Sequence, residues 1–176
     1  MFTIAKNAGE KGKAYRDVFV DTLHSMIQTD PAVYCLEADL GGASNTLKLK
    51  ASDPEHFIEC GISEANMMGV AAGMSSEGLK PFVHTFAPFA TRRAFDQIYL
   101  SGAYAHDTLN IWGSDPGFTA GANGGTHNSW EDVAMMRTLP GAWVCDAADA
   151  VQMEWILREF AKADGIHYVR AGRKES

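Results

Sequence analysis

Three short segments of the sequence hold the residue types that could do chemistry. The first is residues 61–66, where Ser63 is expected to cap a helix rich in small residues and Glu64 falls in its first turn. An acid in that position either complements the helix dipole and nothing more, or is a functional carboxyl at a strand-to-helix junction. The sequence leaves both interpretations of Glu64 open.

The second segment places two aromatic rings after a predicted strand. Phe86 and Phe89 are three residues apart, with Arg92 and Arg93 close behind. Rings at this spacing usually belong to the core. If a turn begins there, both rings can reach one face and form a flat apolar slot for a heteroaromatic ring.

The third segment, residues 121–127, is too rich in glycine to be a stable element and ends on His127. This imidazole is either a solvated loop side chain or a group that exchanges protons with a ligand. The loop matches neither a Walker phosphate loop nor a dinucleotide fingerprint. The histidines and cysteines lack metal-ligand spacing, so no metal site is predicted.

Short apolar segments that alternate with helical patterns must position these residues. The alternation predicts an α/β fold, a doubly wound and mostly parallel sheet with helices on both faces. Ligands bind at the carboxyl ends of such strands, where all three segments fall. Asp149 with Gln152 three residues on marks the start of the last helix. The expected strands are residues 32–36, 57–60, 81–85, 109–113, 143–146 and 167–169; the expected helices are residues 15–27, 63–76, 89–105, 130–138 and 149–162.

Length and composition limit the class of protein. The 176 residues predict one domain, and 46% hydrophobic with 21% charged residues excludes a disordered chain. A net charge of -7 argues against a broad nucleic-acid surface. No charge-free stretch approaches the roughly 20 residues of a membrane span, and the first residues lack a secretory pattern, so we expect a cytoplasmic protein. Three separated cysteines predict reduced structural thiols.

The order of several motifs resembles the pyrimidine-binding domain of the transketolase family. The resemblance covers most of the chain, from about Arg16 to Arg173, and implies the thiamine-diphosphate-binding fold. Deoxyxylulose-phosphate synthases and the β-subunits of 2-oxo acid dehydrogenases share this domain. The matching motifs are Gly-Ile-Ser-Glu-Ala-Asn-Met at 61–67, Pro-Phe and Thr-Phe within 81–86, Arg-Arg-Ala-Phe-Asp-Gln at 92–97, Gly-Gly-Thr-His at 124–127 and Arg-Thr-Leu-Pro at 137–140.

The resemblance implies roles for four residues at the cofactor. Glu64 matches the glutamate that hydrogen-bonds the pyrimidine ring nitrogen of thiamine diphosphate. Desolvation by an apolar slot favours the protonated carboxyl, which could donate this bond, whereas the field of the helix terminus favours the anion. Phe86 and Phe89 match the aromatic slot that holds the ring. Asp39 matches an acidic residue near the cofactor.

The resemblance also implies a site for a sugar phosphate. His127 matches a histidine that contacts the substrate, and Arg16 and Arg173 match phosphate-binding arginines. Asp115 stands where transketolases usually carry a second histidine. Asn123, within Ala-Asn-Gly-Gly, stands where they have Glu-Asp-Gly-Pro. These departures imply different sugars or an impaired catalyst.

The family's other domains have no match in residues 1–176, which form one transketolase-like pyrimidine-binding domain. The Gly-Asp-Gly and Asn ligands that hold Mg²⁺ and the diphosphate are not found, and we expect no C-terminal domain in this chain. The resemblance therefore implies a partner subunit that carries the diphosphate-binding domain, with Mg²⁺ held mainly there, and self-association into a heterotetramer.

The resulting hypothesis is a subunit of a heteromeric transketolase that moves a two-carbon ketol unit from a ketose phosphate to an aldose. Arg16, Arg92, Arg93 and Arg173 are the expected anion-binding cations of this acidic chain. Two alternatives stay open. One is a subunit of a thiamine-diphosphate enzyme that decarboxylates a 2-oxo acid, and the other is a non-catalytic subunit that stabilises or regulates a transketolase.

Overall fold

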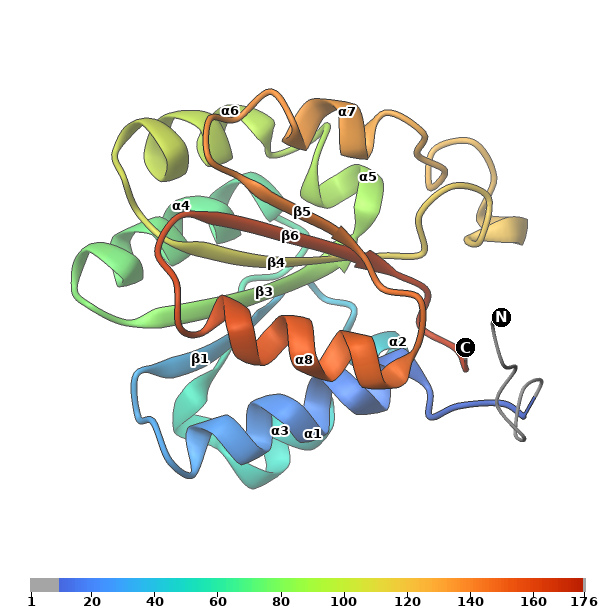
Figure 1. The fold of residues 1–176 in the computed structure, drawn as a ribbon, viewed down its shortest axis with the longest axis horizontal. Helices are drawn as coiled ribbons and strands as arrows, with labels where there is room; N and C mark the ends of the chain where they lie inside the picture. The colour runs from blue at the N-terminus through green and yellow to red at the C-terminus, as the bar shows by residue number, and fades with distance from the viewer. Residues whose placement is uncertain (1–9, 176) are drawn as a thin grey trace, which may run out of the picture.

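A six-stranded sheet in which every strand pair is parallel forms the centre of the molecule (Figure 1). It is seen in a computed structural model that describes residues 10–175. The strand order is β2-β1-β3-β4-β6-β5, and all six predicted strands are confirmed within one or two residues at their ends. The strands are β1 Val33–Glu37, β2 Phe57–Glu59, β3 Lys80–Phe86, β4 Leu109–Ser114, β5 Trp143–Asp146 and β6 Ile166–Ala171.

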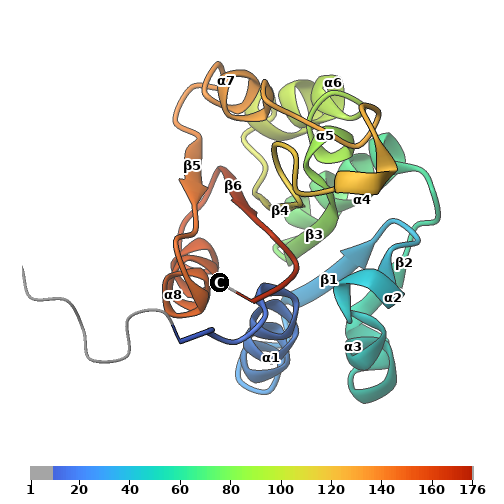
Figure 2. The ribbon, with the colours of Figure 1, turned by 90° about the vertical axis from the view of Figure 1, so that its right-hand side faces the viewer.

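Helices cover both faces of this sheet, as the alternating pattern predicts (Figures 1 and 2). Helices α1 (Tyr15–Ile27) and α8 (Ala150–Phe160) lie on one face, and α4 (Glu64–Ser76) and α7 (Asp132–Met136) lie on the other. The order of the strands changes direction between β1 and β3, which makes their carboxyl ends the expected ligand-binding point of a doubly wound sheet.

Alternate residues of the strands divide the core between the two faces. Cys35 of β1 and Phe82 of β3 face α1, whereas their neighbours Leu36 and Val83 face α4. The ring of Trp112 in β4 packs 4.8 Å from Phe19 of α1, centroid to centroid. Burying side chains of this size stabilises the fold by about 1.5–3 kcal/mol each.

Of the two predicted helix caps, the structure shows the side-chain hydrogen bond of one and not of the other. The Asp149 side chain accepts a hydrogen bond from the backbone of Gln152 at 2.7 Å, so the predicted start of α8 is confirmed. Ser63 occupies the cap position of α4 but makes no side-chain cap bond, so that prediction is wrong. Its ψ of 62° lies outside the extended conformation of most capping residues.

The predicted helix over residues 89–105 is broken into three pieces. Helix α5 (Ala87–Ala90) ends at Thr91, α6 (Phe95–Gln97) follows, and a π-helical segment η2 (Ile98–Tyr104) completes the region. The break arises where Thr91 leaves helical geometry with ψ near -80° and its hydroxyl donates to the carbonyl oxygen of Ala87. Residues 91–94 are therefore a turn rather than a helix face.

The remaining differences concern short elements. Helix α7 is shorter than the predicted 130–138, and residues after β1 form two helices that the sequence pattern did not predict. The thiols of Cys35, Cys60 and Cys145 are free, and Cys35 is buried. Within the described residues, no helix has the length and apolarity to cross a bilayer. The short elements not yet named are α2 Gly41–Ser44, α3 Leu47–Ser52, η1 Pro54–His56 and η3 Gly121–Asn123.

One buried histidine of β6 is held in its neutral form. His167 Nδ1 lies 2.7 Å from Oδ1 of Asn110, whose amide nitrogen donates to the Pro81 carbonyl, so Nδ1 carries the proton. Its Nε2 is buried and has no hydrogen-bond partner in residues 10–175. Protonation there would place a charge against the stacked ring of Phe160, and burial lowers the pKa of His167 to about 4.

This histidine predicts acid sensitivity of the fold. The unfolded chain takes up the proton near pH 6.5 and the folded chain near pH 4, so the free energy of unfolding falls as the pH falls between these values. The loss amounts to at most about 3 kcal/mol. Urea denaturation across this range should show the slope in the native chain and a smaller slope in His167→Gln. His106→Asn, which removes an exposed histidine at positive φ, should leave the slope unchanged.

Candidate functional site

The carboxyl edge of the sheet gathers the predicted site residues from five loops. Figure 2 looks onto this edge. Because the strands are parallel, the segments that follow β1, β2, β3, β4 and β6 all emerge there. They carry Asp39, Glu64, Phe86 with Phe89, Asp115 with His127, and Arg173 respectively.

Glu64 is a buried carboxylate with a charged partner. It is the first residue of α4 and is 2% exposed. Arg93 donates to both of its oxygens from Nη1, at 2.8 and 2.9 Å. This differs from the expectation of a carboxyl that faces only an apolar slot, because the turn at residues 91–94 brings a guanidinium onto the acid.

Phe86, Phe89 and His127 form one aromatic cluster. Their ring centroids are 4.9–5.8 Å apart in edge-to-face contacts. Two guanidinium groups cover the Phe rings: Arg93 lies 3.9 Å from the centroid of Phe89, and Arg173 lies 4.9 Å from that of Phe86. The two Phe residues and the histidine are therefore brought together, although nothing in the sequence pattern indicated that arginines would stack on the rings.

A cavity of about 600 Å³ adjoins this cluster through Arg173, and its size suits a small polar ligand. Arg16, Asp115 and Arg173 line it, so these three predicted residues lie together. Asp115 accepts from the backbone of Arg173 at 3.1 Å and from its Nε at 2.5 Å. The Nε of Arg16 is buried without a partner in the described chain.

Among the described residues, the side chains of Asp39 and Asn123 form no hydrogen bond or ion pair with the aromatic cluster or with the residues that line the cavity. Asp39 is exposed with a φ of 57°, and its backbone N–H donates to Glu59. Asn123 is exposed at the end of η3. Their implied roles at the cofactor and the substrate stay predictions.

Arg92 and Arg93, also expected to bind anions, do not line the cavity that Arg16 and Arg173 line, so for these two residues anion binding stays a prediction. Arg92 pairs with Glu131 at 2.9 Å and donates to the carbonyl of Asn128, while Arg93 pairs with Glu64. Both charges are balanced by carboxylates of the chain itself. Arg92 also donates to the carbonyl of Thr126 at 3.4 Å and so links the glycine-rich loop to the segment after β3.

Beneath the loops lies a buried polar pair that the sequence analysis missed. Glu37 of β1 and His84 of β3 are both 0% exposed and stand opposite each other in the strand register, with both carboxylate oxygens 2.9 Å from Nδ1. Ser44 and Thr46 donate to the same carboxylate at 2.8 and 2.6 Å. The signal available in the sequence was an acid and a histidine, each at the carboxyl end of an apolar strand.

These donors decide the charge of the buried acid. Burial alone would raise the pKa of Glu37, but the His84 ring and the hydroxyls of Thr46 and Ser44 outweigh it and lower the pKa below its ordinary value. The carboxylate is thus ionised at neutral pH. It ties the loop that carries Asp39 to the strand that ends at Phe86.

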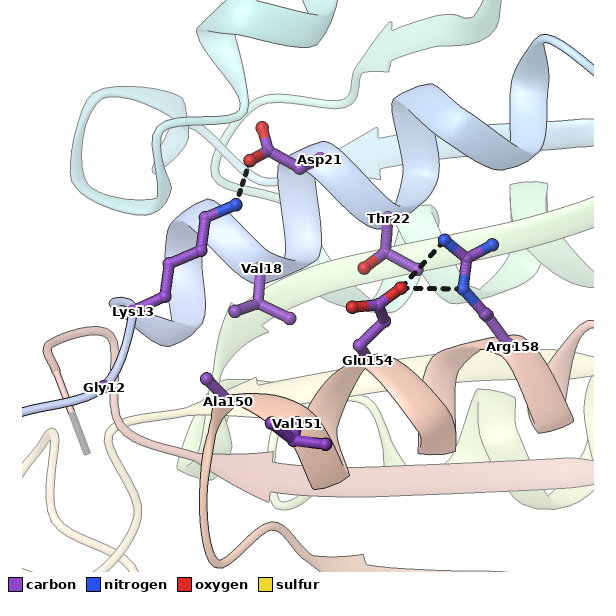
Figure 3. Close-up of a pocket in the computed structure, with 9 residues that line it drawn as sticks. All are labelled: Gly12, Lys13, Val18, Asp21, Thr22, Ala150, Val151, Glu154 and Arg158. Atoms are coloured by element: carbon purple, nitrogen blue, oxygen red, sulfur yellow. Dashed lines mark hydrogen bonds and ion pairs between the residues drawn. The ribbon is translucent and has the colours of Figure 1, made fainter. Parts of the chain in front are cut away.

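Another hollow lies between α1 and α8 (Figure 3), and none of its lining residues lines the cavity of Arg16 and Arg173. Lys13, Asp21, Glu154 and Arg158 line its rim, and two ion pairs join them, Lys13 with Asp21 and Arg158 with Glu154. None of the predicted site residues lines this hollow, and its charges are already matched. The carboxyl edge is therefore the candidate site.

Comparison with known protein families identifies the family of the chain. The family model for the transketolase pyrimidine binding domain matches residues 11–176. The chain belongs to this family. The match covers the carboxyl-edge loops described above and confirms the resemblance seen in the sequence motifs.

Relatives include subunits of transketolases. The chain is 43% identical over 159 residues to a 6-deoxy-6-sulfo-D-fructose transketolase subunit of a Clostridium species, covering 90% of this chain and 49% of that protein. It is 32% identical to an apulose-4-phosphate transketolase subunit of Phocaeicola vulgatus, covering 91% and 51%. The chain thus spans about half the length of these relatives.

Solved structures agree on the fold. One described as a split gene transketolase, inactive beta4 tetramer, has a TM-score of 0.81 and 37% identity, covering 93% of this chain and 52% of that one. The transketolase of Leishmania mexicana has a TM-score of 0.84 at 21% identity, over 96% and 26%. The second likeness shows the fold alone.

The buried pair predicts strong coupling between Glu37 and His84. Glu37→Leu leaves the buried His84 ring without its carboxylate, and His84→Leu leaves the buried Glu37 charge with only the Ser44 and Thr46 hydroxyls as side-chain partners. Each variant should therefore lower the free energy of unfolding by about 3–5 kcal/mol. The double variant should lose less than the sum of the two single losses. Urea denaturation of the four proteins measures this. Additive losses would show that the two side chains stabilise the fold independently.

The Asp115 contact predicts the anion affinity of the cavity. Asp115→Asn removes the charge that holds Arg173 and keeps a residue type that tolerates the local φ of 50°. Calorimetric titration with inorganic phosphate should then show about tenfold tighter binding, equivalent to ~1.4 kcal/mol. Asp21→Asn removes the same charge from the rim of the other hollow and should leave phosphate binding unchanged. An unchanged affinity in Asp115→Asn would show that Arg173 does not bind the anion.

Proposed function

We propose that this chain is the pyrimidine-binding part of a heteromeric, thiamine-diphosphate-dependent transketolase. The reaction moves a two-carbon ketol unit from a ketose phosphate to an aldose. The observation that carries the proposal is the buried Glu64 carboxylate at the start of α4, beside the cluster of Phe86, Phe89 and His127. The transketolase subunits among the relatives support the reaction class.

The residues at the carboxyl edge fit a flat, polar heteroaromatic ring. Glu64 offers a hydrogen-bonding carboxyl and Phe89 an aromatic face, both within reach of one group, since Arg93 contacts them together. The hydroxyl of Thr85, two residues after Val83 on the face of β3 that packs against α4, is buried without a partner in the described part of the chain. A buried hydroxyl without a partner is a position where water or a ligand can bind.

Thiamine diphosphate supplies the carbanion chemistry of ketol transfer when it is bound. In the proposal, Glu64 holds the pyrimidine ring by a hydrogen bond and Phe86 and Phe89 orient it. We assign the diphosphate and Mg²⁺ to a partner subunit, because the family match is to the pyrimidine-binding domain. The solved structure described as a split gene transketolase, inactive beta4 tetramer, supports self-association of such subunits, and we infer that the chain and its partner subunit form a heterotetramer.

The cavity beside the cluster is the proposed site of the sugar phosphate. The guanidinium groups of Arg16 and Arg173 can each pair with phosphate oxygens in a bidentate manner. In the proposal, His127 exchanges a proton or a hydrogen bond with the substrate, and its packing against Phe86 and Phe89 beside Arg173 supports this role. Asp115 restrains Arg173 and so takes part in selecting which phosphate ester binds.

The test is ketol transfer by the chain assembled with a partner subunit that carries the diphosphate-binding domain. Glu64→Gln should lower turnover at least about a hundredfold, the lower end of what a positioned acid–base group contributes. Undiminished turnover would contradict the role of Glu64. Release of CO₂ from a 2-oxo acid would favour the decarboxylase alternative. An assembled complex that binds no thiamine diphosphate in calorimetry would favour the non-catalytic subunit.

A further inference from the structure

We propose that Arg93 occupies, in the cofactor-free chain, the contacts that the aminopyrimidine ring takes when it binds, and that it must swing away to admit the ring. The inference rests on the proposed function of Glu64. Arg93 then competes with the cofactor ring for the same contacts, and this competition sets the affinity of the chain for the cofactor.

Two contacts of Arg93 define its position. Its Nη1 donates to both oxygens of Glu64, and the centre of its guanidinium lies 3.9 Å from the ring centroid of Phe89. These are the two groups proposed to bind the cofactor ring, one through an edge and the other through a face. One arginine therefore blocks the hydrogen-bonding and the stacking position together.

A guanidinium group has the shape and the donors to imitate this ligand. It is planar, it presents N–H donors in its plane, and its flat face stacks on aromatic rings. An aminopyrimidine also combines in-plane polar groups with a flat face. The same acid and the same ring can therefore satisfy either group, but not both in the same place.

The burial of Glu64 explains why a substitute is needed. The carboxylate is 2% exposed, and a buried carboxylate without a partner is strongly destabilising. Arg93 supplies the partner in the absence of a ligand. When a ring with its own hydrogen-bonding edge arrives, Glu64 exchanges one partner for another and is not left unpaired.

The position of Arg93 in the chain lets it leave. It stands in the turn at residues 91–94 between α5 and α6, and its side chain is 46% exposed. The side chain can turn into solvent without moving α4 or β3. Arg92 cannot play this role, because it contacts neither Glu64 nor Phe89. Its partners are the Thr126 carbonyl in the glycine-rich loop and, just after that loop, the Asn128 carbonyl and Glu131.

Competition lowers the apparent affinity by the fraction of chains in which the site is open. It also gives Arg93 opposite effects on two measurable quantities. Removing Arg93 should destabilise the cofactor-free chain, because Glu64 loses its partner. It should also tighten cofactor binding, because the competing side chain is gone. If the ion pair were purely structural, removing Arg93 would destabilise the free fold and would not tighten cofactor binding. If Arg93 helped to hold the cofactor, removing it would weaken both the fold and the binding.

The experiment compares native, Arg93→Met and Arg93→Lys chains. Thermal melting of the free chain and calorimetric binding of thiamine diphosphate with Mg²⁺ to the complex with the partner subunit are the two readouts. Arg93→Met should melt at a lower temperature and bind the cofactor about tenfold more tightly, which corresponds to an open fraction near one tenth in the native protein. Arg93→Lys keeps the charge but not the planar stack, so its affinity should lie between the two.

Two controls separate this proposal from the proposed function. Arg158→Met removes an arginine ion pair on α8 and should leave cofactor affinity unchanged. Glu64→Gln should weaken cofactor binding, and if it does not, the proposed role of Glu64 fails. If Glu64→Gln weakens binding while both Arg93 variants bind the cofactor equally or less tightly than the native complex, the competition proposal alone is overturned.

Discussion

The arrangement of the carboxyl edge depends on the buried carboxylate of Glu37, which joins two strands and a loop by hydrogen bonds. It is fully buried at the point where the strand order changes direction, and it accepts hydrogen bonds from His84 on the neighbouring strand and from the loop hydroxyls of Ser44 and Thr46. An unpaired charge at this depth would cost several kcal/mol, so strand, loop and histidine must adopt one arrangement together. The loop after β1 and the aromatic cluster after β3 are thereby held in a fixed relation.

Three arginines at the carboxyl edge are each paired with a carboxylate of the chain, although the chain as a whole is acidic. Arg93 pairs with Glu64, Arg173 with Asp115 and Arg92 with Glu131. The arginines that follow β3 and β6 are therefore not a free basic patch in an acidic protein. Any anion or ring that enters must replace a contact that the chain already makes, which favours ligands with matching geometry over ligands that offer charge alone.

The sequence allowed the sheet to be predicted because each strand is a short apolar run that must be buried on both faces. It also located Glu64, Phe86, Phe89 and His127 at loops that a parallel sheet brings to one edge. The break after α5 was not predictable from periodicity, because Ala90, Ala94 and Ile98 keep an apolar helical spacing through the turn. The pairing of Glu64 with Arg93 depends on that turn and so escaped the sequence analysis, as did the register that sets Glu37 opposite His84.

The strand order has a consequence for how the chain reaches its fold. Strand β5 pairs with β6, and β6 in turn fills the place between β5 and β4, although it is the last strand in the sequence. The pairing of Leu109 with Ile166 closes a loop of 57 residues, and no strand pair of this sheet is a hairpin. Contacts this far apart in sequence form slowly, because the entropy of loop closure is lost before the contacts are gained. During synthesis, β5 has no partner strand until β6 emerges, because β6 is the strand that joins it to β4. The loops that carry Asp115 and Arg173 meet only after that last strand is in place.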